Sequence, residues 1–216
     1  MSVSTLIVRL REYRRRHGFS GTIRRIGLGM RRGLFANRMV VFYCDLAPQE
    51  LPASTISSPL KVNRLNSEAE LSQQDLEPMT SIWNPRLALR NIKERFAKGA
   101  SLWLIKSGNQ LAGYGWTLRG CTIEPYYFPL RPDDAHLFDF HVFSQYRGQG
   151  INPLLVEYIL RSLGIERGGR AFIEAAEWNE AQLSSLRKTP FRRLGVARSL
   201  AIFGHKFTRW TQDENT

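Results

Sequence analysis

The stretch from residue 136 to residue 163 limits the possible folds of this chain more than any other part. It begins with the apolar, strand-like run His136–Phe143 and ends with the apolar, helix-like run Asn152–Leu163. Between them lies the turn Gln145-Tyr-Arg-Gly-Gln-Gly150, in which one residue separates two glycines. A strand that feeds a helix through so short a turn belongs to an α/β domain, and the free backbone N–H groups at the helix start point outward.

The composition of this turn suits a phosphate group. The free N–H groups and the helix dipole together place partial positive charge at the start of the helix. Glycine at positions 148 and 150 permits positive φ angles and lets a bulky anion approach the backbone. The turn matches neither G-x-G-x-x-G nor G-x-x-x-x-G-K-[ST], the two common nucleotide-binding loops. We therefore predict a pyrophosphate site of another type.

The remaining sequence alternates strand-like and helix-like segments. Ser67-Glu-Ala-Glu70 matches a capping box, and Asn84-Pro85 places a capping residue before a proline at the first helical position. We predict helices from Ser67 to the residue before Pro78, from Pro85 to a stop at Gly99, over Asn152–Leu163 and over Glu180–Leu194. After a β-rich run, Met39–Asp45, we predict strands over Lys61–Leu65, Ser101–Lys106, Leu111–Leu118, His136–Phe143 and Ala171–Ala176, and a final strand or hairpin over Ala197–Phe207. This order predicts a mixed α/β sheet with helices on both faces, in one domain.

Positive charge is concentrated at the N-terminus. Ten arginines and one glutamate give residues 1–40 a net charge of +9, out of +12 for the whole chain. We therefore divide the chain into an arginine-rich amphipathic segment, residues 1–38, and a domain, residues 39–216. For the segment, an anionic membrane surface ranks first because apolar residues recur at helical spacing beside the arginines. A solvated tail ranks second. Nucleic acid ranks third because the aromatic residues of the segment do not alternate with arginines in the manner that stacks bases.

Composition indicates where the protein works. Hydrophobic residues make up 43% of the chain, which is enough to fill a core. No apolar run reaches the ~20 residues that span a bilayer, and the N-terminus lacks a secretory signal. We expect a cytoplasmic protein, with a peripheral position at the inner face of the membrane as the alternative. Cys44 and Cys121 are read as two reduced thiols without metal-ligand neighbours. The sequence leaves open whether the chain is a monomer or a homodimer.

The turn and its surroundings resemble the GNAT superfamily, the GCN-five-related N-acetyltransferases. The signature of that family is [Q/R]-x-x-G-x-[G/A], and Gln145 to Gly150 satisfies it. The acidic Asp139 and the apolar Val142 on the preceding strand are similar to the family, as is the order of elements from about residue 61 to residue 208. The resemblance implies a mixed, mostly antiparallel sheet. It also implies an N-acyltransferase that moves an acetyl or other acyl group from acyl-CoA to a small-molecule primary amine, by direct attack in a ternary complex and without a metal.

The resemblance further implies which residues bind the acetyl-CoA or other acyl-CoA. The strand backbone from Phe140 to Val142 would pair with the pantetheine arm, and the turn amides would hold the pyrophosphate. Asn179 would contact the arm, with a helix N-cap as the alternative. The implied cofactor residues are Phe140, Val142, Gln145, Tyr146, Arg147, Gly148, Gln149, Gly150, Ile151 and Asn179.

The reaction needs a base that takes a proton from the amine. The candidates are Asp139, His141 and Glu174. Asp139 and His141 lie two apart on one strand and so project to the same face. For both, a purely structural role is the alternative, and an aspartate among Leu137, Phe138 and Phe140 would be desolvated.

The acid is less well defined. Many family members place a tyrosine four residues before the glycine that ends the last helix, and this chain has Phe191 there, before Leu194-Gly195. The acid is then Tyr126, Tyr127, Tyr146 or water. Otherwise the chain is a catalytically silent acyl-CoA-binding or acyl-CoA-sensing module, docked on a membrane or partner.

The acceptor is suggested by the connection Glu124–Asp134, which is rich in aromatic and acidic residues. Such residues suit a sugar or a cationic amine, and packing of the connection against the core is the alternative. Together with the basic N-terminus, this connection resembles GNAT proteins of bacterial surface-polysaccharide and envelope clusters. That resemblance implies an amino sugar or an envelope precursor as the acceptor.

Overall fold

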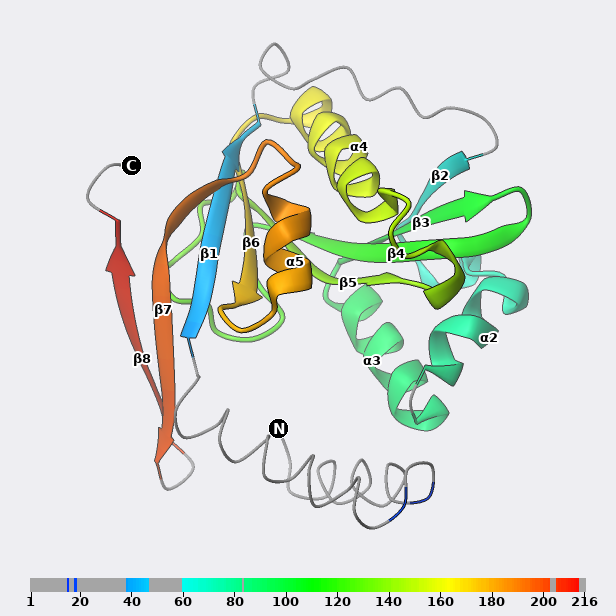
Figure 1. The fold of residues 1–216 in the computed structure, drawn as a ribbon, viewed down its shortest axis with the longest axis horizontal. Helices are drawn as coiled ribbons and strands as arrows, with labels where there is room; N and C mark the ends of the chain where they lie inside the picture. Colours follow the sequence, from blue (N-terminus) through cyan, green and yellow to red (C-terminus); the bar gives the residue numbers. More distant parts are fainter. Residues whose placement is uncertain are drawn as a thin grey trace.

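The computed structural model describes residues 15, 18, 38–46, 60–82, 84–202 and 205–213. Its centre is an eight-stranded sheet with the strand order β2-β3-β4-β5-β6-β1-β7-β8 (Figure 1). The strands are β1 (Arg38–Asp45), β2 (Leu60–Leu65), β3 (Ser101–Ser107), β4 (Gln110–Arg119), β5 (Ala135–Val142), β6 (Arg170–Ala176), β7 (Arg192–Ile202) and β8 (His205–Gln212). The α-helices are α2 (Gln73–Ser81), α3 (Pro85–Ala97), α4 (Ile151–Glu166) and α5 (Glu180–Leu186), and the 3-10 turns are η1 (Glu68–Glu70) and η2 (Ser144–Tyr146). The predicted mixed, mostly antiparallel α/β sheet is confirmed.

The sheet contains a split between β5 and β6. These two strands form the parallel pair of the described sheet, and their pairing runs only from Ala135↔Ala171 to Leu137↔Ile173. β5 continues to Val142 and β6 to Ala176 beyond this point. Figure 1 shows the two strands pointing in different directions, so the sheet opens after Leu137.

β1 joins the sheet in a place that its position in the chain does not suggest. It pairs antiparallel with β6 on one side and with β7 on the other. Residues 38–45 therefore lie in the interior of the sheet, between strands that are more than a hundred residues away in the sequence. β7 and β8 form an antiparallel hairpin outside β1, which confirms the hairpin alternative for the C-terminal region.

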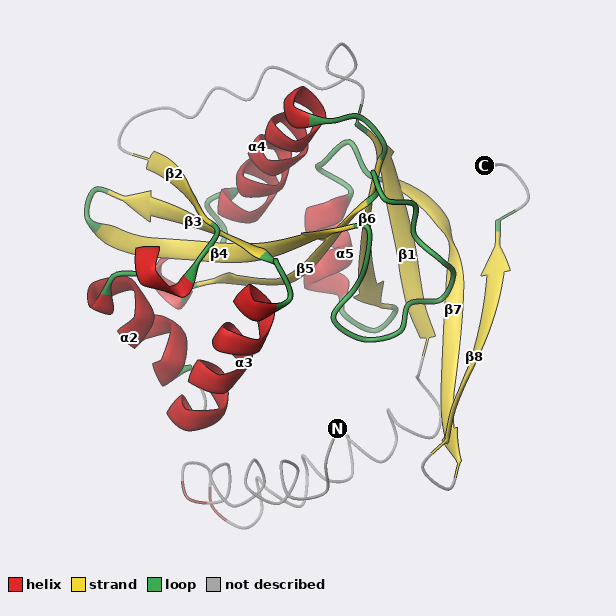
Figure 2. Cartoon of the chain, turned by 180° about the vertical axis from the view of Figure 1, so that it is seen from behind, coloured by secondary structure: helices red, strands yellow, loops and turns green. Residues whose placement is uncertain are grey.

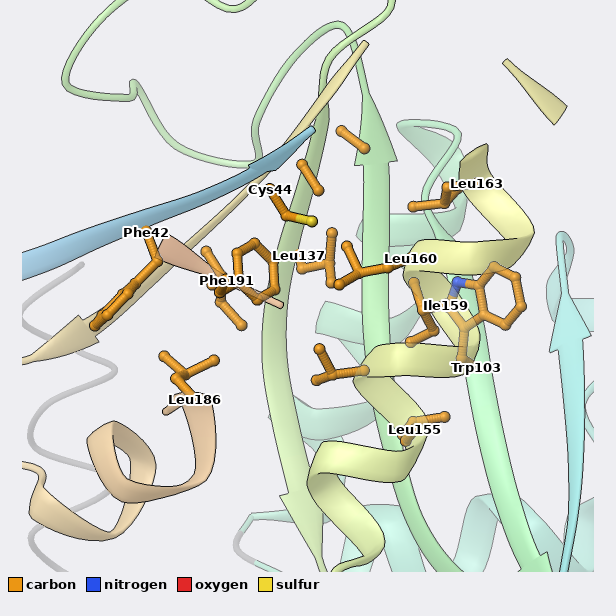
Figure 3. Close-up of a cluster of buried hydrophobic side chains, with 14 of the residues drawn as sticks. Phe42, Cys44, Trp103, Leu137, Leu155, Ile159, Leu160, Leu163, Leu186 and Phe191 are labelled. Carbon is orange, nitrogen blue, oxygen red and sulfur yellow. The ribbon is translucent and has the colours of Figure 1, made fainter. Parts of the chain in front are cut away.

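Two buried cores cover the two faces of the sheet. α4 and α5 pack on one face and form the α4–α5 core with it, and α2 and α3 pack on the other face (Figure 2). β3 serves both cores by strand alternation, because Trp103 and Ile105 face α4 while Leu102 and Leu104 face the other side. Figure 3 shows Trp103 beside the apolar side of α4. Helices therefore lie on both faces of the sheet, as the sequence predicts.

A third cluster lies under the connection between β4 and β5. Tyr126, Tyr127 and Phe128 pack against a buried group that includes Phe172 of β6 and Leu194 of β7. Tyr126 contacts Phe172 at a ring-centroid distance of 6.5 Å, and Phe128 contacts it at 5.3 Å. The packing alternative for this aromatic connection is confirmed.

The predicted start and end of the first helix are wrong. Ser67 accompanies the short turn η1, where its hydroxyl donates to Glu70 at 2.8 Å. The α-helix starts later, because Ser72 accepts a hydrogen bond from the N–H of Asp75 and caps α2. The helix then passes through Pro78, which places Met79 in the core under α2.

The predicted helix over Glu180–Leu194 is also too long. α5 ends at Leu186, and the chain turns where Thr189 N–H bonds to the Leu186 carbonyl at 3.0 Å. Pro190 lacks an N–H and follows this turn, so the helix cannot continue. Phe191 is consequently not a helical residue. It is 7% exposed and belongs to the α4–α5 core, as Figure 3 shows.

The other predicted helices and strands are confirmed to within a few residues. The helical spacing noted in residues 1–38 stays a prediction, because only residues 15, 18 and 38 of this segment are among the described residues. None of the helices in the described ranges has the length and apolar character that a bilayer crossing requires.

Close packing of β4 against β5 yields a test of stability. A Cβ added at Gly115 would overlap the Phe140 ring, whereas one added at Gly168 meets nothing within 4 Å. We expect Gly115→Ala to lower the free energy of unfolding by about 1–3 kcal/mol through overpacking. Gly168→Ala, the matched control, should leave it unchanged or slightly raised. Urea denaturation measures both, and equal effects of the two variants would contradict this packing.

Candidate active site

The signature turn adopts a conformation that requires glycine. β5 ends at Val142, η2 follows, and the chain enters α4 at Ile151. Gly148 has φ 79° and Gly150, the N-cap of α4, has φ 75°. Residues with a side chain rarely adopt this left-handed conformation, which explains both glycines locally.

The space in front of the turn is open. A Cβ added at Gly148 or Gly150 meets no atom within 4 Å, so a ligand can approach the backbone there. Leu154 N–H bonds to the Gly150 carbonyl at 3.2 Å and closes the first helical turn. The N–H groups of Ile151 and Asn152, which come before it, have no acceptor within the helix. The start of α4 therefore presents backbone donors toward an open space.

A hollow of about 490 Å³ lies beside this turn. It is bounded by the end of β5, by the turn with the first residues of α4, and by α5. Of the implied cofactor residues, it brings together Phe140, Val142, Tyr146, Arg147, Gly148, Gly150, Ile151 and Asn179. Gln145 and Gln149 are not among its lining residues, and Gln149 donates to the Gln145 carbonyl at 3.0 Å.

Sequence reasoning missed one wall of this cofactor hollow. The further lining residues on and after α5 are Ala181, Gln182, Ser184, Ser185 and Lys188. Positions 181, 184, 185 and 188 repeat at helical spacing, and this periodicity could have identified them. Lys188 adds a positive charge to a site that already contains Arg147.

Two side chains of the turn are held in place. Arg147 Nε donates to the Val142 carbonyl at 3.1 Å, which ties the turn back to β5. The Tyr146 hydroxyl donates to Gln110 at 2.9 Å at the start of β4. Tyr146 therefore lines the cofactor hollow while its proton is directed toward the β3–β4 hairpin.

A second hollow, of about 230 Å³, lies on the other face of the sheet. Its apolar wall comes from α2 and α3, and its polar wall combines α3 with β4 and β5. The lining residues are Met79, Ile82, Ala88, Asn91, Ile92, Arg95, Tyr114, Asp139 and His141. His141 lines this hollow and the cofactor hollow, so one imidazole joins the two spaces.

Asp139 occupies an irregular position in β5. Its φ of 50° is positive, and the β4–β5 register shifts between Tyr114 and Trp116. The carboxylate forms an ion pair with Arg95, whose guanidinium lies 5.1 Å from the Trp116 ring centroid. Because the Asp139 side chain is 45% exposed and paired, the expectation that it is desolvated among apolar neighbours is wrong. Asp139 and His141 do line one hollow, as their spacing predicts.

The surroundings of His141 favour the neutral imidazole. The ring stacks on Tyr114 at a centroid distance of 5.6 Å. Burial lowers the pKa of His141, the positive charge of Arg147 lowers it further, and Asp139 acts in the opposite direction. Burial also raises the pKa of Tyr114 far above its usual range, so this phenol keeps its proton. The second hollow therefore presents a neutral histidine and a protonated tyrosine.

Glu174 belongs to a separate polar cluster at the start of the split. Its carboxylate accepts a hydrogen bond from the Tyr126 hydroxyl at 3.2 Å and lies 2.9 Å from His136 Nε2. Burial, followed by the charge of Glu174, raises the pKa of Tyr126 well above its usual value. His136 is 5% exposed and was not predicted as a site residue, although it shares the signature strand.

Tyr127 packs in the third buried cluster, under the connection between β4 and β5. Its ring stacks on Trp210 of β8 at a centroid distance of 6.5 Å, and burial raises its pKa. Neither Tyr126, Tyr127 nor Glu174 lines the cofactor hollow or the second hollow.

The location of Asn179 is compatible with both of its predicted roles, the cap of a helix and a contact with the cofactor arm. It caps α5 by accepting from the N–H of Gln182 at 3.3 Å, which confirms the N-cap. It also lines the cofactor hollow, so contact with a bound arm stays a prediction.

The cap gives a direct test. We expect Asn179→Ala to lower the free energy of unfolding by about 1 kcal/mol, because the Gln182 N–H loses its acceptor. Asn179→Asp keeps an acceptor oxygen at the cap and should retain most of this stability. Chemical denaturation compares the variants, and equal losses in both would argue against the cap.

Comparison with known proteins places this geometry in a family. The sequence model of the acetyltransferase (GNAT) family matches residues 68–191, more than half of the chain. A search of curated protein sequences found no match. The match leaves β1 and the β7–β8 hairpin outside its limits.

Several solved structures have a similar fold. One is the glucosamine N-acetyltransferase region of a fungal multi-domain GH3 beta-N-acetylglucosaminidase, with a TM-score of 0.54 and 11% identity over 81% of this chain and 22% of that one. A tandem GNAT protein from the clavulanic acid biosynthesis pathway has a TM-score of 0.52 and 16% identity, over 82% of this chain and 52% of that one. A GNAT protein from Sphaerobacter thermophilus has a TM-score of 0.52 and 12% identity, over 83% and 55% of the two chains. The chain thus spans only about half of the latter two proteins, and identities this low indicate the fold alone.

Proposed function

The chain belongs to the GNAT acetyltransferase family, and on that premise we propose that it transfers an acetyl or other acyl group from acyl-CoA to a primary amine. The observation that carries this proposal is the position of His141, which lines both hollows. A donor in one hollow and an acceptor in the other would meet beside this imidazole. Such an arrangement suits direct attack in a ternary complex.

The cofactor hollow supports binding of the acyl-CoA. The amides at the start of α4 would hold the pyrophosphate, and Arg147 and Lys188 would add positive charge. The pantetheine arm would lie along β5 in the split, in the manner of an added strand, because β5 and β6 stop pairing at Leu137↔Ile173. Phe140 and Asn179 would contact the arm from opposite walls.

The second hollow supports binding of the amine. His141, kept neutral by its lowered pKa, would accept the proton of the ammonium group. The amine nitrogen then attacks the thioester carbonyl, forms the C–N bond and places negative charge on oxygen. A backbone N–H near Val142 would donate to this oxygen. The nitrogen then gives its second proton to water, the C–S bond breaks, and coenzyme A leaves as a thiolate that takes up a proton from water.

The contacts of the other base candidates favour His141. The carboxylate of Asp139 is engaged by Arg95, and that of Glu174 lies between Tyr126 and His136. A free thiol has a pKa near ~8.5, so water suffices as the acid. A tyrosine at position 191 would point into the core and is not required in this scheme. The alternative of a catalytically silent acyl-CoA-binding module depended on Phe191. Turnover of acetyl-CoA, measured by mass spectrometry, tests this alternative, and binding without turnover would favour it.

The walls of the second hollow favour a small acceptor with both apolar and polar faces. Met79 and Ile92 offer apolar contact, while Asn91 and Tyr114 offer hydrogen-bonding groups. An amino sugar or related envelope precursor fits this description. Attachment of residues 1–38 to an anionic membrane would bring the enzyme to such a precursor, and binding of the full chain to phosphatidylglycerol vesicles tests it.

The donor site is tested by a matched pair of glycine variants. Gly148→Val and Gly150→Val together should abolish coenzyme A binding, because the side chains fill the open space that the phosphates need. Gly99→Val is the control, since Gly99 has φ 80° and equally open space but lies after α3. Calorimetric titration with coenzyme A measures the affinity of the folded variants. Retained affinity in the double variant, or equal loss in the control, would count against the proposed donor site.

The base is tested by a pH profile. We expect His141→Gln to lower the rate by about 10²- to 10⁴-fold at neutral pH, with coenzyme A affinity preserved. Because both enzymes act on the same amine, the ratio of the wild-type rate to the variant rate is free of the pH dependence that comes from ionisation of the amine. Because a base acts only when neutral, this ratio should fall as pH drops through the lowered pKa of His141, below the usual value of about 6.5.

Glu174→Gln serves as the comparison for this profile. If Glu174 is not the base, its variant should keep the pH dependence of the wild type. A profile that disappears in Glu174→Gln and survives in His141→Gln would reverse the assignment of the two residues.

A further inference from the structure

A third hollow, of about 280 Å³, lies on the strands β1, β7 and β8. It is lined by Arg38, Arg193, Val196, Arg198, Arg209, Thr211 and Asp213. Four of these seven residues are arginines, and one is acidic. We call this feature the arginine hollow.

Three of the arginines lie side by side across the sheet. Arg38 of β1 pairs in register with Arg198 of β7, and Arg198 pairs with Arg209 of β8. Like charges directly opposite each other on neighbouring strands destabilise a sheet. The fold nevertheless holds these three cations in one row, so a bound anion would relieve their repulsion.

Carboxylates compensate this charge only in part. Arg38 forms an ion pair with Glu177 at 3.3 Å, and Arg193 forms one with Asp213 at 2.9 Å. In the part of the chain that the structure describes, no carboxylate pairs with Arg198 or Arg209. The Nε atom of Arg38 is buried and has no hydrogen-bond partner among the described residues. Arg198 and Arg209, both exposed, therefore contribute donors and uncompensated positive charge to the arginine hollow.

The backbone beneath the row is well supported. Val40 pairs with Val196 directly beside the arginines, and Val40 packs into the α4–α5 core. Trp210 packs with Tyr127 in the cluster on the opposite face of the sheet. Because strand residues alternate between faces, the arginines project on the same side as α5. The row is thus a feature of paired strands rather than of a loop.

The arginine hollow is separate from the proposed reaction. It shares no lining residue with the cofactor hollow or with the second hollow. Arg193, Arg198 and Arg209 also lie outside residues 68–191, the segment that matches the family. The family relationship therefore does not account for this site.

We propose that the arginine hollow binds a small phosphate-bearing anion. Guanidinium groups donate paired hydrogen bonds to phosphate oxygens, and a row of them favours an anion with more than one charge. The volume is slightly below the ~300–1,000 Å³ of ordinary small-molecule sites, which suits a phosphate or diphosphate group. Among the described residues that line the hollow none is aromatic, so none could stack on bases, and the one apolar residue of this set, Val196, is buried. These features favour a small anion over nucleic acid or a bilayer.

Calorimetric titration of the full chain with pyrophosphate, at fixed ionic strength, tests the proposal. Because pyrophosphate can also occupy the signature turn, the titration is done with saturating coenzyme A, and the remaining binding is assigned to the arginine hollow. We expect Arg198→Gln combined with Arg209→Gln to weaken this binding by about tenfold or more, since each lost hydrogen bond involves a charged group. Arg161→Gln, an exposed arginine on α4, is the control and should leave the affinity unchanged.

Four other results would overturn the proposal. Pyrophosphate affinity that is equal in the wild type and the double variant would remove the site. An equal loss in Arg161→Gln would indicate general charge attraction. Weaker coenzyme A binding in the double variant would make the arginine hollow part of the donor site. Binding of phosphatidylglycerol vesicles or single-stranded RNA through these arginines, without pyrophosphate binding, would assign it to a macromolecule. Failure of coenzyme A to bind at all would affect the proposed transferase only, because the two arginines are still tested by pyrophosphate alone.

Discussion

The split between β5 and β6 is the constraint on which the rest of this molecule depends. The two strands pair over Ala135–Leu137 and then separate, which leaves the far half of β5 beside a hollow. The separation coincides with a bulge. Tyr114 of β4 pairs with His141 and Trp116 pairs with Phe138, so Gly115 lies opposite two residues, Asp139 and Phe140. A bulge bends a strand and increases its twist, which carries β5 away from β6.

The same bulge decides which face each side chain reaches. Leu137 packs into the α4–α5 core, and uninterrupted alternation would place His141 on that face as well. Phe140 instead packs on the α4 side of the sheet, over Gly115. His141 lies on the opposite side, where it stacks on Tyr114 and lines the second hollow. A non-glycine residue at positive φ costs about 1–3 kcal/mol, and the ion pair of Asp139 with Arg95 helps to hold it there. Asp139 thereby positions His141.

These contacts show what the sequence can and cannot predict. The signature turn is local: two glycines, a strand before and a helix after fix its geometry. Eight of the ten predicted cofactor residues line one hollow, and Gln145 and Gln149 do not. Pairing between distant strands is not local, so nothing in residues 38–45 indicates that they enter the sheet between β6 and β7. The helix predicted after Glu180 is too long because Leu194-Gly195 resembles the end of the family's last helix, whereas Pro190, which lacks an N–H, prevents a helix from reaching that point. The face of His141 was unpredictable because a bulge adds one residue without a sequence marker.

Arg147 connects the electrostatics of the two proposed binding sites. Its Nε donates to the Val142 carbonyl, so the guanidinium is fixed at the edge of the cofactor hollow. Burial is the main reason why the pKa of His141 is lowered; the charge of Arg147 lowers it further, whereas Asp139 raises it. Asp139 is itself paired with Arg95, which limits how far it can favour the charged imidazole. In the proposed reaction, the cation that helps to bind the donor phosphates therefore adds to the effect of burial in favouring the neutral base. The lowered pKa of His141 thus follows from its burial between the two hollows, and the carboxylate that opposes it, that of Asp139, is engaged by Arg95.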